Sequence, residues 1–343
     1  MKILVTGNRG YIGSVLVQYL IEKSYDIVGY DSDFYSDNYL YPYNPEILQI
    51  FKDTRDCSIE DLKSIDAVIH LAALSNDPLG ELSPHLTLDI NFGATIKLAR
   101  LAKEARVKRF IYASSQSMYG ISKTDKELDE DDSEKNPVTA YAKTKWDAEI
   151  ELKKMCSNDF VVTAFRPSTV FGPSPKLRTD IVFNNLVACA YTTGKIEILS
   201  DGSPWRPVIH VKDVCQAFIA GLEAPAELIA ARSFNVGIEN GNFTVRDLAN
   251  AAQNAVPGCE LVFLNQHTDP RSYKISFKRI FNELREFYKP EWNLEKGGRE
   301  LVEYFKKVNF TENDFRGRKC SRLKQINFLI LNKELDNNLR KIK

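Results

Sequence analysis

A tyrosine and a lysine stand four positions apart at Tyr141 and Lys145, in the stretch Tyr-Ala-Lys-Thr-Lys. Residues four apart on a helix share one face, so the ammonium group of Lys145 can lie beside the phenol of Tyr141. A close cation stabilises the phenolate and moves the pKa of a tyrosine from about 10 toward about 7. Such a phenolate can act as a general base toward a substrate hydroxyl group.

A run of serines supplies a second group for the same chemistry. Residues 109–113 are rich in β-forming side chains, and Ser114-Ser115-Gln116-Ser117 follows them directly. The carboxyl ends of parallel strands are where α/β folds bind ligands. We therefore expect the Ser115 hydroxyl to bridge a substrate oxygen and the phenol of Tyr141.

Three glycines near the start of the chain favour binding of a dinucleotide. They stand at Gly7, Gly10 and Gly13, between an apolar run (residues 3–6) and an amphipathic helical pattern that begins at Tyr11. The first glycine permits a tight turn, the second a close approach of backbone to a pyrophosphate, and the third close packing of helix and strand. The free N–H groups at the helix N-terminus then attract the phosphates.

An acidic residue indicates which dinucleotide binds. Asp31 ends the second strand-like run, 18 residues after Gly13. A carboxylate there can accept both hydroxyls of the adenosine ribose and repels a 2′-phosphate. Arg9 argues the other way, because a guanidinium in the glycine loop could meet that phosphate. On balance we predict that the cofactor is NAD, with NADP less favoured. The positive charge of a bound nicotinamide would lower the pKa of Tyr141 further.

The elements that carry these residues alternate between strands and helices. The predicted strands are residues 3–6, 26–30, 48–51, 67–71, 109–113 and 161–165, and the predicted helices are residues 11–23, 84–105 and 141–156. Apolar strands separated by helices are typical of a parallel sheet covered on both faces. The sequence therefore predicts an α/β, Rossmann-type doubly wound sheet.

The alternation ends after residue 173. We expect a dinucleotide-binding domain over 1–173, with 207–240 returning to it through a strand at 234–237. We expect 174–343 to form mainly a smaller, partly interleaved substrate-binding domain with a basic tail. In that domain the patterns predict helices at 180–193, 244–255, 278–287 and 296–307, and a strand at 196–199.

The tail from Arg316 onward carries nine basic and two acidic residues, a net charge of +7. Packing of residues 328–331 on the body, as part of a terminal helix, is the favoured interpretation. Docking to an acidic partner or to a membrane surface is the alternative.

Composition excludes several other classes of protein. The 343 residues include 46 basic and 46 acidic side chains, so the chain is not built to coat nucleic acid. The six cysteines form no C-x-x-C pair, and no histidine stands at ligand spacing from a cysteine or another histidine, so we expect neither a disulfide scaffold nor a metal site. No apolar run approaches the roughly 18 residues of a membrane span. Because Met1 leads directly into a strand pattern, we expect no signal peptide and a cytoplasmic protein.

The spacing G-x-x-G-x-x-G resembles that of the short-chain dehydrogenase/reductase superfamily. Together with Tyr141 and Lys145, and with the stretches at 166–173 (RPSTVFGP) and 201–213 (DGSPWRPVIHVKD), the chain resembles the extended members. These form the NAD-dependent epimerase/dehydratase family, which acts on nucleotide sugars. The likeness runs from about residue 2 to residue 307.

The resemblance implies a role for particular residues. Lys145 would also hold the nicotinamide ribose, and Asp53 and Thr54 would lie near adenine. The whole set implied to bind the cofactor is Gly7, Arg9, Gly10, Tyr11, Ile12, Gly13, Asp31, Asp53, Thr54, Leu71, Ala72, Ala73, Tyr141, Lys145 and Pro167. The catalytic set is Ser115, Tyr141 and Lys145.

The residues expected to bind a nucleotide-diphosphate sugar are Ser117, Thr169, Asn184, Asn185, Arg206, Arg178 and Arg271. Arg206 suits a diphosphate in its own right because a guanidinium is a permanent bidentate donor. Arg178 and Arg271 are weaker candidates for the same anion, and an ordinary surface arginine is the alternative for each.

Two departures from the family pattern bear on the reaction. Dehydratases of the family carry an acidic pair after the catalytic hydroxyl residue, whereas this chain has Gln116 and Ser117. Elimination of water by that route is therefore not expected. Thr169 stands where the family often has asparagine, which suggests a substrate other than a galactose derivative.

The favoured function is an NAD-dependent nucleotide-sugar epimerase that acts through a transient 4-keto sugar. A 4-dehydrogenase or 4-ketoreductase that releases its product is the alternative, because the same residues support both outcomes. A non-catalytic NAD-binding sensor is a more remote one, since such proteins usually lack the tyrosine or the lysine. The resemblance also implies a homodimer, formed through the helices at 84–105 and 141–156.

Overall fold

The computed structural model describes residues 1–122, 124–266 and 272–342. Its centre is a seven-stranded sheet in the order β11-β7-β5-β4-β1-β2-β3, in which every neighbouring pair is parallel. The strands are β1 (Lys2–Thr6), β2 (Asp26–Asp31), β3 (Leu48–Phe51), β4 (Ala67–His70), β5 (Arg109–Ala113), β7 (Val161–Pro167) and β11 (Arg232–Val236). The strand order reverses between β1 and β4, and a ligand crevice forms at such a point.

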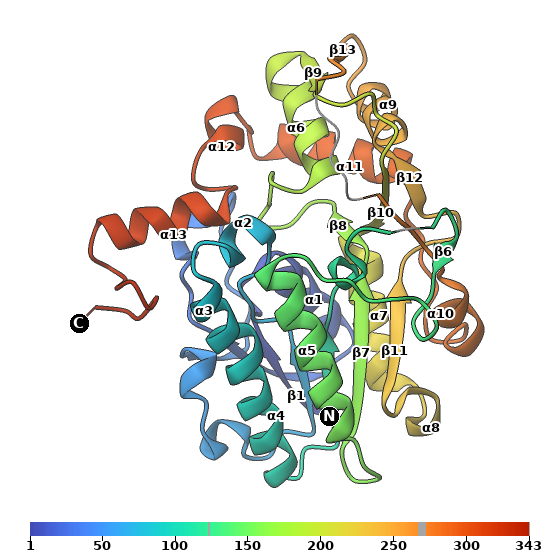
Figure 1. Ribbon diagram of the computed structural model, residues 1–343. Helices are drawn as coiled ribbons and strands as arrows, with labels where there is room; N and C mark the ends of the chain where they lie inside the picture. The colour runs from blue at the N-terminus through green and yellow to red at the C-terminus, as the bar shows by residue number, and fades with distance from the viewer. Residues whose placement is uncertain (123, 267–271, 343) are drawn as a thin grey trace.

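Alternate residues of the strands face two different layers of helices (Figure 1). Ile3 and Val5 of β1 join the apolar cluster that contains α1 (Tyr11–Glu22) and α7 (Val211–Glu223). Leu4 between them joins the opposite cluster with α4 (Ala94–Glu104) and α5 (Ala140–Lys154). Because both faces are covered, the strands are apolar on both sides. The predicted α/β doubly wound fold is confirmed.

Three small sheets and a helical layer form above the carboxyl ends of these strands. The first small sheet has three strands in the order β12 (Asn242–Thr244), β10 (Trp205–His210) and β8 (Thr169–Phe171). The second pairs β13 (Glu260–Phe263) with β9 (Lys195–Ile198). The third pairs β14 (Lys274–Ile275) with β6 (Glu127–Leu128). The longer helices here are α6 (Val182–Thr193), α9 (Val245–Ala255) and α11 (Leu294–Lys307), which pack on one another. The short helix α12 (Glu312–Arg316) packs on α6, whereas α8 (Ala226–Ile229) and α10 (Lys278–Glu283) lie beside β11 of the main sheet.

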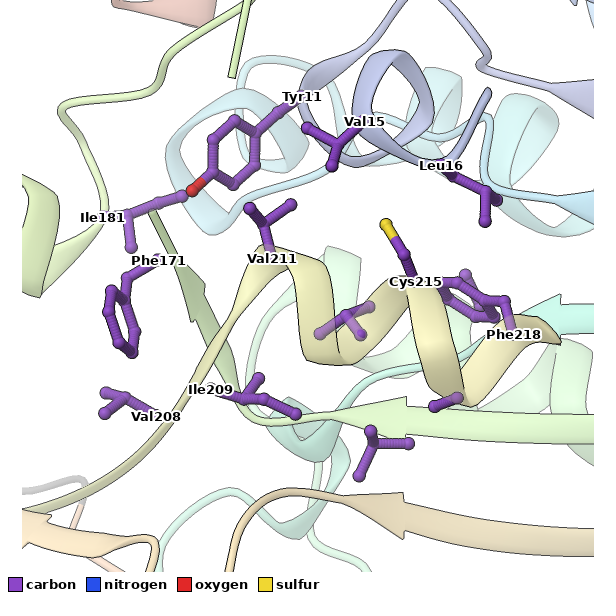
Figure 2. Packing of buried hydrophobic residues seen from close by; sticks show 14 of the residues in the cluster. Tyr11, Val15, Leu16, Phe171, Ile181, Val208, Ile209, Val211, Cys215 and Phe218 are labelled. Carbon is purple, nitrogen blue, oxygen red and sulfur yellow. The ribbon is translucent and has the colours of Figure 1, made fainter. Parts of the chain in front are cut away.

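The upper elements join the main sheet through a continuous apolar core (Figure 2). Tyr11 and Val15 of α1 face α7, where Val211 and Cys215 meet them, and Phe171 of β8 lies at the edge of this group. The hydroxyl of Tyr11 donates a hydrogen bond to the carbonyl of Gly172, 2.7 Å away. The first helix after the glycine loop is therefore tied directly to the region that follows residue 171.

The helix predicted over residues 84–105 is present as one continuous helical run to Glu104, but it is not a regular α-helix throughout. The structure has α3 (Pro84–Thr87), a wider π-helical turn (Leu88–Gly93) and then α4. The amide of Asn91 in that turn accepts a hydrogen bond from the backbone N–H of Leu74 and donates one to the carbonyl of Leu74. The turn thus holds the segment that follows β4. Such turns are often found at functional sites.

The other differences lie in the second half of the chain. The helix predicted at 278–287 ends at Glu283, as α10. The tail packs on the body of the protein. Its helix α13 (Arg322–Leu331) buries the side chains of Ile326 and Leu329. They pack against Leu79 of the short helix α2 (Asp77–Gly80), among other residues. The structure thus has the packed arrangement that the sequence favoured for this segment.

None of the helices within the described residues is both long enough and apolar enough to cross a membrane.

Candidate active site

A cavity of about 490 Å³ opens at the carboxyl ends of the strands, next to the point where the strand order reverses. It is lined by residues of the glycine loop, of the segments after β2, β4 and β5, of α5 and of the upper region. The lining includes Gly7, Gly10, Tyr11, Ile12, Gly13, Asp31, Asp53, Thr54, Leu71, Ala72, Ala73, Ser115, Tyr141, Lys145 and Pro167. All residues predicted to bind a dinucleotide, except Arg9, therefore surround one space.

The glycine loop has the geometry that a phosphate site requires. Gly7 has a φ of +72°, and a Cβ atom there would lie 2.8 Å from the backbone nitrogen of Ala72. A Cβ atom on Gly13 would lie 2.1 Å from the carbonyl oxygen of Gly7. Helix α1 then begins at Tyr11 with Gly10 as its N-cap and no side-chain cap, which leaves its first N–H groups for an anion.

Asp31 is positioned by the backbone on either side of it. Its carboxylate accepts hydrogen bonds from the N–H groups of Arg9 (3.1 Å) and Asp33 (2.8 Å). Burial raises the pKa of Asp31, and these two hydrogen bonds counteract the rise. The guanidinium of Arg9 does not line the cavity, because its Nε lies 2.9 Å from a carboxylate oxygen of Asp33. This ion pair with Asp33 competes with any contact between Arg9 and a 2′-phosphate.

Ser115, Tyr141 and Lys145 come together in the same cavity. Ser115 follows β5 and caps a 3₁₀ turn (Gln116–Tyr119), where its Oγ accepts a hydrogen bond from the N–H of Ser117 at 3.1 Å. Tyr141 lies in the first turn of α5. Lys145 is 3% exposed, and its Nζ donates a hydrogen bond to the carbonyl of Ala113 at 2.7 Å.

The pKa of Tyr141 differs from the prediction. Burial raises it above its ordinary value, while a hydrogen bond with Ser115 and the charge of Arg178 counteract the rise. Burial also lowers the pKa of Lys145, to about 7. In the chain without cofactor, Lys145 is not among the groups that shift the pKa of Tyr141, and burial disfavours the charged form of both side chains. The positive charge of an oxidised nicotinamide would act in the required direction.

A buried ion pair holds the catalytic helix against the sheet. Glu149, two turns beyond Tyr141, accepts a hydrogen bond from Nη2 of Arg166 on β7 at 2.6 Å, and both side chains are fully buried. The same carboxylate accepts from the hydroxyls of Ser114 at 2.6 Å and Ser233 at 2.5 Å. The residue next to Ser115 is thereby bonded to the helix that carries Tyr141.

The predicted substrate residues separate into two groups. Ser117, Thr169, Arg178 and Arg206 line the cavity. Asn184 and Asn185 do not line it. Asn184 is fully buried and forms hydrogen bonds with Tyr11, Gly172 and Arg178. Asn185 donates a hydrogen bond to the carbonyl of Thr179. Arg271 lies outside the described residues.

Several cavity residues were missed by the sequence reasoning. They include Asp180, which pairs with Arg178 at 2.7 Å, and Asn76, which donates a hydrogen bond to Asp180. Val138, Thr139, Tyr273 and Arg322 line the cavity as well. The basic character of the tail was the only sequence feature that could have drawn attention to Arg322.

A model of the family described as "NAD dependent epimerase/dehydratase family" matches residues 3–237. The chain belongs to this family. The curated relatives include the UDP-glucose 4-epimerase of Mycolicibacterium smegmatis, which is 29% identical over 89% of this chain and 99% of its own. The human dTDP-D-glucose 4,6-dehydratase is 30% identical over 69% of each chain. Among solved structures, MoeE5 in complex with UDP-glucose and NAD is 25% identical, with a TM-score of 0.75 over 90% of this chain and 100% of that one.

Members of this family are NAD-dependent enzymes, and the cavity fits their cofactor. The uncapped start of α1 and the close approach at Gly7 and Gly13 suit a pyrophosphate, and Asp31 suits an unphosphorylated ribose. Tyr141 and Lys145 line the same cavity as the glycine loop and Asp31.

One buried lysine beside this cavity should make the stability of the protein depend on pH. Lys176 is fully buried, and its Nζ lies 3.7 Å from the ring centroid of Tyr39 with no hydrogen-bond partner among the described residues. Burial lowers the pKa of Lys176 from 10.5 to about 7. Between these pH values the unfolded chain binds the additional proton, so the native state gains stability as the pH rises.

We therefore predict that K176M raises the free energy of unfolding most below pH 7, and that the gain shrinks as the pH approaches 10.5. Urea unfolding of the nucleotide-free protein across this range measures the effect. Lys63→Met, at an exposed position, is the matched control and should show no such trend. A K176M variant that loses stability most at low pH would contradict the prediction.

Proposed function

We propose that the protein is a nucleotide-sugar 4-epimerase that acts through a transient 4-keto sugar. The observation that carries this proposal is the meeting of Tyr141, Ser115 and Lys145 in the same cavity as the glycine loop and Asp31. The 4-epimerase among the curated relatives and the UDP-glucose complex among the solved structures support it.

Each of the three residues has a defined task. Tyr141 removes the proton of the C4 hydroxyl and later returns one to the C4 oxygen. Ser115, hydrogen-bonded with Tyr141, holds the same sugar oxygen. Lys145 orients the cofactor ribose and stabilises the phenolate by its charge. A bound NAD would supply the acceptor for the C4 hydride and the donor that returns it to the opposite face of the ketone.

Dehydration is disfavoured by the residues after Ser115. Gln116 is buried, and its Nε2 donates hydrogen bonds to the carbonyls of Arg166 at 2.9 Å and Val236 at 3.4 Å. An amide held in this way cannot supply a proton to a leaving C6 oxygen. Ser117 has a hydroxyl instead of the carboxyl group that would remove the C5 proton.

The diphosphate of the substrate is assigned to the upper wall of the cavity. Arg206 of β10 lines the cavity beside Thr169 of β8. A guanidinium stays charged at every physiological pH and matches a diphosphate with two parallel hydrogen bonds.

Incubation with UDP- and dTDP-linked hexoses, followed by proton NMR, tests the reaction class. A 4-epimer formed without net NADH is the expected result. Stoichiometric NADH with a released 4-keto sugar would instead establish the 4-dehydrogenase. A 4-keto-6-deoxy product would contradict the exclusion of dehydration.

We predict that Y141F lowers kcat by about 10²- to 10⁴-fold, because it removes the general base. The dissociation constant for NAD should stay close to that of the wild type, since the ring and its packing remain. Tyr41→Phe is the control, because that ring is 41% exposed. Unchanged turnover by Y141F would rule out this tyrosine as the base.

We further propose a homodimer formed through residues 84–105 and 141–156, and a cytoplasmic location. Leu88, in the π-helical turn between α3 and α4, is 47% exposed, as expected of a side chain that a partner covers. The six cysteines are free, which fits a reducing compartment. Light scattering at micromolar concentration should give the dimer mass, and a monomer mass would contradict the dimer.

A further inference from the structure

The C-terminal segment, residues 318–342, lies against the cofactor side of the cavity. It follows the part of the chain that the family model matches, which ends at residue 237. The amide of Asn38, in the connection between β2 and β3, donates hydrogen bonds to the carbonyls of Arg318 at 2.7 Å and Lys319 at 2.8 Å. One turn into α13, Gln325 donates to the carbonyl of Phe34 at 3.2 Å. The segment thus holds the loop that follows Asp31.

The end of the same segment is bonded to the segment after β3. Arg340 lies 2.5 Å from a carboxylate oxygen of Asp56 and 3.4 Å from one of Asp53. Arg55 donates a hydrogen bond to the carbonyl of Leu339 at 3.3 Å. Asp53 and Thr54 line the cavity, so this contact also lies on its cofactor side.

Apolar contacts join the segment to a third part of the cavity wall. Ile326, Leu329, Leu335 and Leu339 form one cluster with Leu74, Leu79, Leu86 and Ile90. Leu74 and Ile90 are themselves cavity residues. Figure 1 shows α13 beside α2. The segment therefore contacts the connections that follow β2, β3 and β4.

Arg322 is the residue of this segment that reaches the cavity. It is 3% exposed and lines the cavity. Its Nη2 donates a hydrogen bond to the carbonyl of Lys176 at 2.7 Å, and its guanidinium lies 4.6 Å from the ring centroid of Tyr35. Its Nη1 is buried without a hydrogen-bond partner among the described residues.

The charge of Arg322 is poorly compensated by the protein. Burial lowers its pKa and the charge of Arg178 adds to that effect, whereas Tyr35 and the charge of Asp180 partly oppose it. The neighbouring guanidinium groups differ in this respect: Arg178 is paired with Asp180, and Arg9 with Asp33. No carboxylate of the described residues forms an ion pair with Arg322. A buried, unpaired guanidinium is unfavourable unless a ligand supplies the anion.

The place of Arg322 identifies which anion fits. Tyr35, on which its guanidinium lies, stands four residues beyond Asp31, the residue assigned to the adenosine ribose. The cavity continues from there past the glycine loop to Tyr141. In a dinucleotide that spans this distance, the pyrophosphate lies between the two ribose groups. A planar fork of N–H donors matches it.

We propose that Arg322 binds the pyrophosphate of the dinucleotide from the side opposite the glycine loop, so that the C-terminal segment retains the cofactor. The inference rests on the use of NAD in the proposed function. It adds a phosphate contact from a part of the chain that the family model does not match.

Measured affinities for NAD, ADP and adenosine test the proposal. Wild type, R322M and R322Q are freed of nucleotide on charcoal and titrated by calorimetry. R322Q removes the charge but keeps a polar, hydrogen-bonding end on a shorter side chain, so it serves where R322M does not fold. K324M is the control, because Lys324 lies on the same helix with an exposed side chain.

We expect both Arg322 variants to raise the dissociation constants for NAD and ADP by about 10- to 100-fold. The constant for adenosine, which has no phosphate, should change less than about twofold, and K324M should match the wild type in all three. Release of labelled NAD should accelerate in proportion.

Two results would overturn the inference alone. The first is an Arg322 variant that binds ADP as tightly as the wild type. The second is a variant that loses as much affinity for adenosine as for ADP, which would show that Arg322 only forms part of the pocket wall. A wild-type protein that binds no NAD would overturn the proposed function together with this inference. These readouts require no turnover, so they separate the two cases.

Discussion

The buried ion pair between Glu149 and Arg166 is the interaction on which the arrangement of the site depends. It joins α5 to β7, while Ser114, directly after β5, and Ser233 of β11 donate hydrogen bonds to the same carboxylate. Burial raises the pKa of Glu149, but the charge and hydrogen bonds of Arg166 outweigh it and hold the pKa at about 2. The pair therefore stays ionised at any physiological pH, and loss of one partner would leave a buried charge at a cost of about 3–5 kcal/mol.

This constraint explains how side chains from distant parts of the sequence reach one place. Tyr141 and Lys145 lie two turns and one turn before Glu149 on α5, so the ion pair sets the rotation and height of all three. Ser115 directly follows the serine that Glu149 binds. The glycine loop is fixed independently, by the contact of Gly7 with the backbone of Ala72 and by the bond of Tyr11 to Gly172. The cavity lies between these two fixed groups.

The parts of this account that depend on local spacing could be predicted from the sequence. The glycine spacing, the position of Asp31 at a strand end and the Tyr141–Lys145 interval each follow from the period of one helix or strand. Contacts between distant segments could not. Asn184 forms hydrogen bonds with Tyr11 and Gly172, and Arg322 lies over the ring of Tyr35. No local sequence pattern indicates either contact. Likewise, the raised pKa of Tyr141 follows from burial, which the helical pattern did not reveal.

The central claim is that hydride leaves C4 of a nucleotide sugar and returns to C4 of the same molecule while Tyr141 holds the proton. The most direct measurement uses a substrate with deuterium at C4 and follows the isotope in the product by mass spectrometry and NMR. The account predicts an epimer that keeps the deuterium at C4, with none in the solvent or in free NADH. Epimer that has lost the deuterium to water would contradict hydride transfer, and deuterium recovered in released NADH would contradict its return to the sugar.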